Sequence, residues 1–264
     1  MYQGIILYGL LVAIAATIYR FIFQQKFNPS ISRRVIWDIL CFSFILIPFN
    51  RISDHRISDY LLGFESSNVI IFIYFIGVCV LSINWLINCL ILLKIRQQSI
   101  KTIVNQSSCY IHNYKKFDCF SWMNKIFLPK DYEKWNEDEI KMILNHETGH
   151  VYYSHWLDLL FIQLLCIFQW FNPAIWYWRK ELMRIHEFEA DKYVVDQSNI
   201  NKKTYQYFLL IENTKKEFNN TFHSFNSGFL KQRILMMNNK SAKKDWVVKG
   251  STIFIAAIFA ALLF

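Results

Sequence analysis

Long apolar runs alternate with polar segments along this sequence. Four runs stand out, at residues 5–23, 35–49, 69–93 and 246–264. A helix needs about 20 apolar residues to cross the roughly 30 Å hydrocarbon core of a bilayer. The first and third runs are long enough for this, and the other two are short but plausible spans. The pattern therefore predicts an integral membrane protein, mainly α-helical, with four transmembrane helices.

Lysines and arginines cluster beside these runs, at residues 20–34, 94–101 and 240–249. Cytoplasmic flanks of membrane spans carry an excess of Lys and Arg. Four alternating crossings place all three clusters on one side, which must then be the cytoplasm. We expect a multi-pass protein of the cell (inner) membrane, with its N-terminus and the 51–68 loop outside.

This orientation divides the chain into three parts. We expect residues 1–93 to form a membrane domain with three spans and residues 246–264 to form the fourth span. Residues 94–245 then form a cytoplasmic α+β domain inserted between the third and fourth spans. No basic residues precede the first run and no small-residue cleavage site follows it, so we expect a retained anchor and not a signal peptide.

The net charge of +9 accompanies a composition that is 54% hydrophobic and 18% aromatic. Basic flanks beside an anionic cytoplasmic leaflet explain such a charge in a membrane protein. The sequence has no motif of interleaved aromatic and basic residues that is typical of nucleic-acid binding. We therefore expect membrane lipid as a partner and no direct binding of nucleic acid.

The polar region begins with a segment that favours strands, followed by a capped helix. Residues 108–129 mix β-branched and aromatic residues and end at Pro129, which predicts two short strands or a hairpin. Asn136, with Glu139 three residues later, predicts a capping box at the start of a helix. A free edge in the strand segment would let a peptide substrate bind as an additional strand.

The next segment, residues 156–171, is apolar but includes Asp158 and two glutamines. It is short for a membrane span. Two interpretations stay open: a helix half-immersed at the membrane interface or a re-entrant hairpin, and a helix of a buried core. Asn172 as a cap and Pro173 at the first helical position predict a further helix after it.

The candidate chemistry begins with HETGH, in which His146 and His150 are separated by one helical turn. Both imidazoles can reach one metal ion from the same helix face. Glu147 lies beside them, placed to accept a proton from a water molecule. The alternative is a chance match on a solvated surface helix.

A catalytic zinc site has three protein ligands and one open position. HEFEAD at residues 186–191 offers the third ligand on a second helix, because Glu187 and Asp191 are four residues apart and share a face. We expect Glu187 to bind one Zn²⁺ per chain and Asp191 to accept the remaining ring N–H of a ligand histidine. The alternative is an acidic, solvated helix face.

Several further residues near these motifs are candidates for other roles in the site. His155 either lines the site and bonds to a ligand, or caps a helix end. His186 points away from the face of Glu187 at helical spacing, so we expect no metal role for it. Amide hydrolysis also needs a group that stabilises the developing oxyanion. The sequence does not choose among four candidates for this role: Tyr152, Arg184, Tyr193 and His223.

Three later segments make the order of motifs similar to that of a known family. FNPAIW at residues 171–176, HEFEADKYVVD at 186–196 and KQRILMM at 231–237 follow HETGH. This order resembles the BlaR/MecR-type antirepressor integral-membrane zinc metallopeptidases, within the Glu-ligand (gluzincin) class. The resemblance covers most of the chain, although each motif alone is only moderately specific.

The resemblance implies His146, His150 and Glu187 as zinc ligands, Glu147 as the general base and Asp191 as the partner of a ligand. In that family a signal outside the cell activates a cytoplasmic peptidase, which cleaves itself or a transcriptional repressor. The best-known members carry a penicillin-binding sensor after the fourth span, whereas this sequence ends within its fourth run. We expect a member without that sensor, either a fragment or a shortened relative.

These observations lead us to expect a signal-transducing zinc endopeptidase with a cytoplasmic active site. Its expected partner is a protein or peptide substrate, which could be a transcriptional repressor or the chain itself. One alternative is a housekeeping membrane peptidase for quality control or C-terminal processing. Another is a non-enzymatic zinc-binding membrane scaffold, which would have no need of Glu147.

Overall fold

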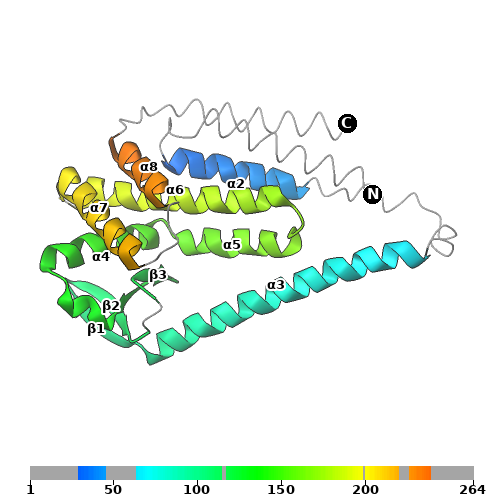
Figure 1. The fold of residues 1–264 in the computed structure, drawn as a ribbon, viewed down its shortest axis with the longest axis horizontal. Coiled ribbons are helices and arrows are strands. Elements are labelled where there is room, and N and C mark those ends of the chain that lie inside the picture. Colours follow the sequence, from blue (N-terminus) through cyan, green and yellow to red (C-terminus); the bar gives the residue numbers. More distant parts are fainter. Residues whose placement is uncertain (1–28, 46–63, 115–116, 199, 220–225, 239–264) are drawn as a thin grey trace.

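The computed structural model describes residues 29–45, 64–114, 117–198, 200–219 and 226–238, which are mostly helical (Figure 1). The helices are α2 (Pro29–Ile45), α3 (Phe64–Gln98), α4 (Glu137–Tyr152), α5 (His155–Phe168), α6 (Pro173–Gln197), α7 (Lys202–Asn219) and α8 (Asn226–Asn238), with a 3₁₀ turn at Lys130–Lys134. The strands are β1 (Ile100–Val104), β2 (Ser107–His112), β3 (Phe120–Trp122) and β4 (Lys125–Pro129).

The strands form one mixed sheet in the order β1-β2-β4-β3. β3 and β4 are antiparallel and joined by Met123 and Asn124, both at positive φ, whereas β2 and β4 are parallel. The structure thus confirms strands within 108–129. It adds β1, which we did not predict, because the sequence IKTIV has no strict alternation of apolar and polar residues.

Helix α4 begins with the predicted capping box. The Asn136 side chain accepts a hydrogen bond from the Glu139 backbone N–H at 2.7 Å, and the Glu139 carboxylate accepts one from the Asn136 backbone N–H at 3.1 Å. The helix packs Leu144 into a small core with Ile126 and Leu128 of β4. The cap and this core together fix where α4 lies against the sheet.

Helices α5 and α6 form an antiparallel hairpin, whose turn is capped as predicted. The Asn172 side chain accepts a hydrogen bond from the Ala174 backbone N–H, and Pro173 is the first residue of α6. Helix α5 buries Ile162 on one face and exposes Phe161 on another. One face of this helix thus belongs to a buried core and another is exposed, so both alternatives for residues 156–171 stay open.

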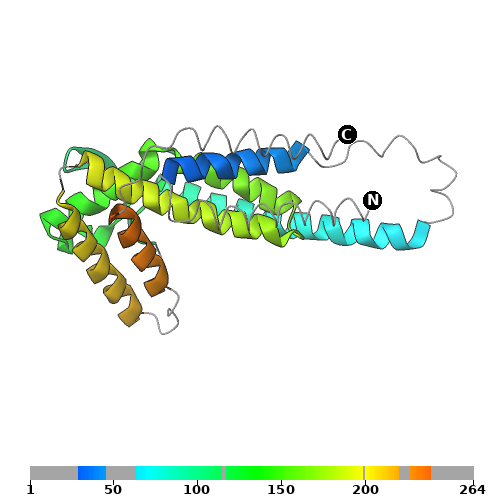
Figure 2. The same ribbon diagram turned by 90° about the horizontal axis from the view of Figure 1, so that it is seen from above.

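Helix α2 shares one hydrophobic core with this hairpin. In Figure 1, α2 and α5 lie on either side of α6, and Figure 2 shows α2 running beside α6. The core buries side chains of all three helices: Val35, Ile36, Leu40, Ile162, Leu165, Cys166, Ala174, Ile175, Trp178, Leu182 and Ile185. A segment that the sequence assigns to the membrane domain thus packs directly onto the helix that carries Glu187.

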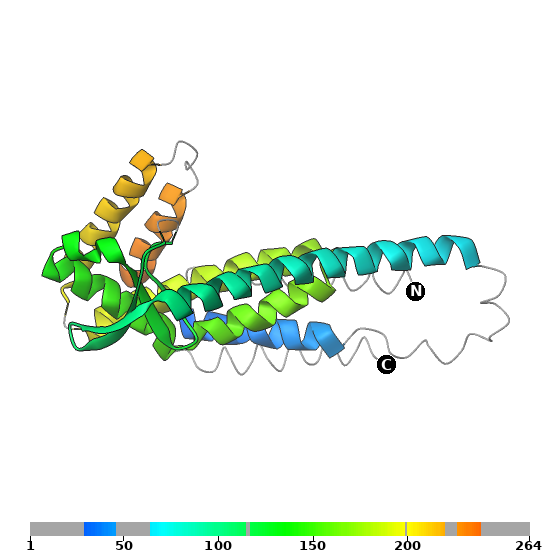
Figure 3. The same cartoon turned by 90° about the horizontal axis from the view of Figure 1, so that it is seen from below.

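Helix α3 runs along α5 and then projects beyond the other helices (Figure 3). Within the described part of the chain it is the one single helix long and apolar enough to cross a bilayer. Helices α4 and α5, bent by 59°, would add a second if they are one broken span. The spans expected at residues 5–23 and 246–264 lie outside the described residues.

Candidate metal centre

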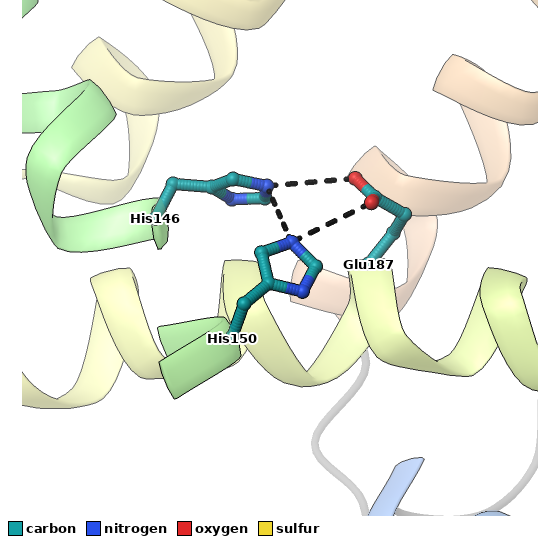
Figure 4. A group of neighbouring side chains, drawn as sticks. All are labelled: His146, His150 and Glu187. Atoms are coloured by element: carbon teal, nitrogen blue, oxygen red, sulfur yellow. Dashed lines mark hydrogen bonds and ion pairs between the residues drawn. The ribbon is translucent and has the colours of Figure 1, made fainter. Parts of the chain in front are cut away.

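Three side chains from α4 and α6 converge on one point (Figure 4). Nε2 of His146 lies 3.2 Å from Nε2 of His150. The carboxylate of Glu187 lies 3.5 Å from each of these nitrogens. Donors held about 2.0–2.1 Å from a tetrahedral zinc ion are separated by about 3.3 Å. Two imidazoles and a carboxylate at these separations fit a zinc ion with a fourth position left open.

A close approach of two helices brings these side chains together. Gly149 of α4 faces α6, and a Cβ at this position would lie 3.0 Å from Cα of Ala190 and 3.1 Å from Cβ of Tyr193. Any larger residue would push α4 away from α6. The glycine inside HETGH therefore lets His146 and His150 reach across to Glu187.

The second ring nitrogen of His146 is held by two groups. Nδ1 lies 2.9 Å from the Tyr205 hydroxyl and 3.4 Å from Oδ1 of Asp191. The Tyr205 hydroxyl donates to the same Asp191 oxygen at 2.8 Å. Asp191 thus lies beside the second nitrogen of a candidate ligand, where we expected it, but the shorter contact to that nitrogen is with Tyr205. The arrangement leaves Nε2 of His146 directed at the three-residue cluster. Tyr205 was not predicted, because it lies on α7, in a segment without a metal motif.

Arg233 of α8 contacts both carboxylates of the site. It donates two hydrogen bonds to the Asp191 carboxylate, at 2.7 and 2.6 Å, and its Nη1 lies 3.2 Å from Glu187. Burial alone would raise the pKa of Asp191, but the charge of Arg233 lowers it to about 2. The same charge, against the effect of burial, holds the pKa of Glu187 well below its usual range. Both carboxylates are therefore ionised at neutral pH.

The only prior signal for Arg233 was its position within KQRILMM, one of the segments behind the family resemblance. The ion pair itself could not be read from the sequence, because Arg233 is 42 residues from Asp191.

His150 is held by a second pair of residues. Its Nδ1 lies 2.8 Å from Nδ1 of His155, and Nε2 of His155 lies 2.9 Å from the Glu189 carboxylate. Burial lowers the pKa of His150 to about 3 and also lowers the pKa of His155, so both rings are neutral. Of the two alternatives for His155, the structure places it in contact with a candidate ligand, buried at the start of α5.

Other residues named from the sequence lie away from the cluster or outside the described residues. His186 bonds to Asp158 at 2.8 Å, as its expected direction implied. The ring of Tyr193 packs against Tyr152, and Arg184 pairs with Glu181. His223 is not among the described residues.

Glu147 is a buried residue of α4 that lies between the two histidines in sequence. Burial of a carboxylic acid beside a cluster of metal-ligand type is the usual setting of a proton acceptor in hydrolysis. The site thus combines three donors suited to zinc with the ionised carboxylate of Asp191, and the buried Glu147 directly follows one of the donors in the sequence.

Comparison with known proteins supports the same type of site as the geometry does. Residues 120–237 match the sequence model of the family described as BlaR1 peptidase M56. Regulatory protein BlaR1 of Staphylococcus aureus is 28% identical over 221 residues, which cover 74% of this chain and 37% of that protein. Regulatory protein BlaR1 of Bacillus licheniformis is 28% identical over 144 residues, which cover 52% of this chain and 24% of that protein.

The chain therefore spans well under half the length of either relative. M56 peptidases are metallopeptidases, which agrees with a cluster of two histidines and a glutamate within the matched region. These matches confirm the predicted resemblance: the chain carries a peptidase domain of the BlaR1 (M56) type and is related to the BlaR/MecR-type regulatory peptidases.

Proposed function

We propose that this protein is a membrane-embedded zinc endopeptidase with its active site on the cytoplasmic side. The observation that carries the proposal is the convergence of His146, His150 and Glu187, whose donor atoms are separated by 3.2 to 3.5 Å. Zinc at such a site polarises a scissile carbonyl and makes water a better nucleophile at neutral pH. Glu147 is the proposed general base.

The chain's own residues transfer the proton and orient the metal ligands. Glu147 accepts a proton from the attacking water and later delivers it to the leaving amine. Asp191 and Tyr205 orient His146, and His155 orients His150. The charge of Arg233 keeps Glu187 and Asp191 ionised. Glu187 therefore remains able to bind the metal, and Asp191 remains able to accept hydrogen bonds.

The proposed substrate is an extended polypeptide that adds to the edge of the sheet. Within the described residues, β3 pairs only with β4, so its other edge has no strand partner. This short strand also packs against α4, the helix of the metal cluster. A peptide bound along β3 would therefore pass close to the site.

The proposed topology places three basic clusters and the peptidase domain in the cytoplasm, with four spans in the membrane. The exposed apolar surface of α3 supports a lipid environment, because few soluble domains leave so continuous an apolar helix uncovered. A cysteine at Glu133, on the exposed 3₁₀ turn, should react with a membrane-impermeant reagent only after the cells are opened. Its control is a cysteine at Ser58, which should react in intact cells. Labelling of Glu133→Cys from outside would overturn this orientation.

The proposed role is regulated cleavage of a transcriptional repressor or of the chain itself. The similarity to two proteins described as regulatory protein BlaR1 favours this role over housekeeping proteolysis. The buried Glu147 favours an enzyme over a zinc-binding scaffold, since metal binding alone has no use for it.

The test of the activity compares the purified wild-type protein with Glu147→Gln and His146→Ala. Zinc content is measured together with fragmentation of the chain and of added β-casein. We expect about one zinc ion per wild-type chain, retained in Glu147→Gln while cleavage falls by roughly 10² to 10⁴-fold. His146→Ala should lose both zinc and cleavage. Undiminished cleavage by Glu147→Gln would overturn the mechanism.

A further inference from the structure

Arg33, in the second turn of α2, connects this helix to three helices around the metal cluster. Its Nε donates to Asp158 of α5 at 2.6 Å, and its Nη1 lies 3.3 Å from Glu189 of α6. Its Nη2 donates at 2.9 Å to the backbone carbonyl of Tyr153, which caps the C-terminal end of α4. One guanidinium group thus ties α2 to the ends or sides of α4, α5 and α6.

Glu189 links Arg33 to the cluster, because it contacts both Arg33 and His155. When this carboxylate is ionised, as its ion pair with Arg33 favours, it accepts a hydrogen bond from Nε2 of His155 at 2.9 Å. A neutral imidazole has one N–H, so Nδ1 of His155 is then an acceptor. It accepts the Nδ1–H of His150 at 2.8 Å, which leaves the lone pair of His150 on Nε2. Nε2 is the nitrogen of His150 that faces His146 and Glu187.

Asp158 supports the chain of contacts that runs from Arg33 through Glu189 and His155 to His150, which we call the relay. It accepts hydrogen bonds from both Arg33 and His186, and the His186 ring stacks on His155 with the ring centroids 4.0 Å apart. The ring of His155 is therefore fixed by a hydrogen bond at each nitrogen and by a parallel ring on one face. Asp158, His155 and His186 are buried and Arg33 is partly buried, so water competes little for these bonds.

The guanidinium is suited to this position because it is planar and carries five N–H donors in a fixed arrangement. Two carboxylates and a backbone carbonyl surround it from three helices. A lysine could satisfy only part of this arrangement. The next residue, Arg34, is exposed, so the two neighbouring arginines of α2 have very different environments.

We propose that Arg33 is a positioning residue for the metal centre, which through Glu189 and His155 sets the ring orientation and tautomer of His150. The inference rests on the zinc site proposed above and adds a route by which α2, in the segment that we assign to the membrane domain, acts on it. Displacement of α2 along α6 would separate Arg33 from Glu189 and release the relay. Placement of α2 is then a determinant of metal affinity and activity.

The test compares Arg33→Gln with Arg34→Gln in the full chain. Both substitutions remove one positive charge from the first two turns of α2, but only the first breaks the relay. Zinc affinity is measured by chelator competition, and the geometry of the site by the visible spectrum of the cobalt-substituted protein. We expect a roughly 10- to 100-fold weaker zinc affinity and shifted cobalt bands for Arg33→Gln. Arg34→Gln should match the wild type in both.

A double-mutant cycle separates the relay from a general loss of stability. His155→Phe keeps an aromatic ring beside His186 but has no ring nitrogen. If Arg33 acts through His155, Arg33→Gln should weaken zinc binding far less in the His155→Phe background than in the wild type. Additive losses in the two backgrounds would overturn the proposal.

Loss of folding is also controlled. If Arg33→Gln does not yield folded protein, Arg33→Lys carries the test, since it keeps the charge but cannot make the same set of hydrogen bonds. This variant should also weaken zinc binding.

Failure of the proposed function gives a different result, because the wild type would then bind no zinc or Glu147→Gln would still cleave. If the wild type binds zinc and Arg33→Gln binds it equally well, the relay alone is refuted.

Discussion

The hydroxyl group of Tyr205 lies 2.9 Å from Nδ1 of His146, although 59 residues separate them in the sequence. The same hydroxyl donates to Asp191 at 2.8 Å, so one side chain of α7 contacts both a candidate ligand and the carboxylate next to it. Tyr205 is fully buried, which places this contact out of reach of solvent.

Replacing Tyr205 with Phe should weaken the site without removing a ligand. Loss of a buried hydrogen bond to an ionised carboxylate costs about 1.5–3 kcal/mol of the free energy of unfolding. Loss of a bond to a ligand histidine should lower zinc affinity by roughly tenfold. Tyr207→Phe on the same helix, where Tyr207 is 65% exposed, is the matched control and should change neither quantity. Equal zinc affinity in the two variants would show that Tyr205 does not orient His146.

Arg233→Gln should be among the most destabilising substitutions in the described part of the chain. It would leave Asp191, which is fully buried, and Glu187 without their cation. Removing one partner of a buried ion pair costs about 3–5 kcal/mol. Thermal unfolding of the purified protein in detergent measures the loss. Lys231→Gln, an exposed cation of the same helix, should unfold like the wild type.

The pH dependence of the metal-free protein should follow His146. Burial lowers the pKa of this group, but hydrogen bonds with Asp191 and Glu187 outweigh burial and raise it from 6.5 to about 9. A raised pKa in the folded state stabilises the fold below the unfolded value, and that stabilisation is lost as pH rises through the folded value. The melting temperature of the metal-free protein should therefore fall between about pH 6.5 and 9.

Zinc binding should show the opposite trend over the same range. A histidine must lose its proton before it can bind the metal. Zinc affinity should thus rise by up to about tenfold per pH unit until pH 9, measured by chelator competition in the wild type. Affinity that stays flat from pH 6.5 to 9 would contradict a raised pKa of His146.

Gly77 of α3 lies against the turn between α5 and α6. A Cβ at this position would lie 2.3 Å from Cε2 of Trp170, whose Nε1 donates to the Tyr74 carbonyl of α3. Gly77→Ala should lower the free energy of unfolding by about 1–3 kcal/mol, because the indole must move. Trp170→Ala should relieve the clash in the double variant. Gly228→Ala, where nothing lies within 4 Å of the added Cβ, is the control and should not be destabilised.

Local sequence determined several elements of this protein. The start of α4, the cap of α6 and the strands of residues 108–129 follow from side chains that act on neighbours a few residues away. The one-turn spacing of His146 and His150 likewise needs only the helical period. The apolar run at residues 69–93 likewise indicated a helix long and apolar enough to cross a membrane, since this depends on the composition of one segment alone.

Tertiary packing decided what surrounds the cluster. Tyr205 of α7 and Arg233 of α8 contact the cluster, and Arg33 of α2 contacts Asp158 and Glu189 behind it. All three come from segments whose own residues show no metal-binding pattern. Arg33 meets Asp158 across 125 residues, a pairing that no local periodicity encodes. Such contacts depend on how helices pack in a shared core, because a buried charge or ring takes its partners from whatever helix the packing brings beside it.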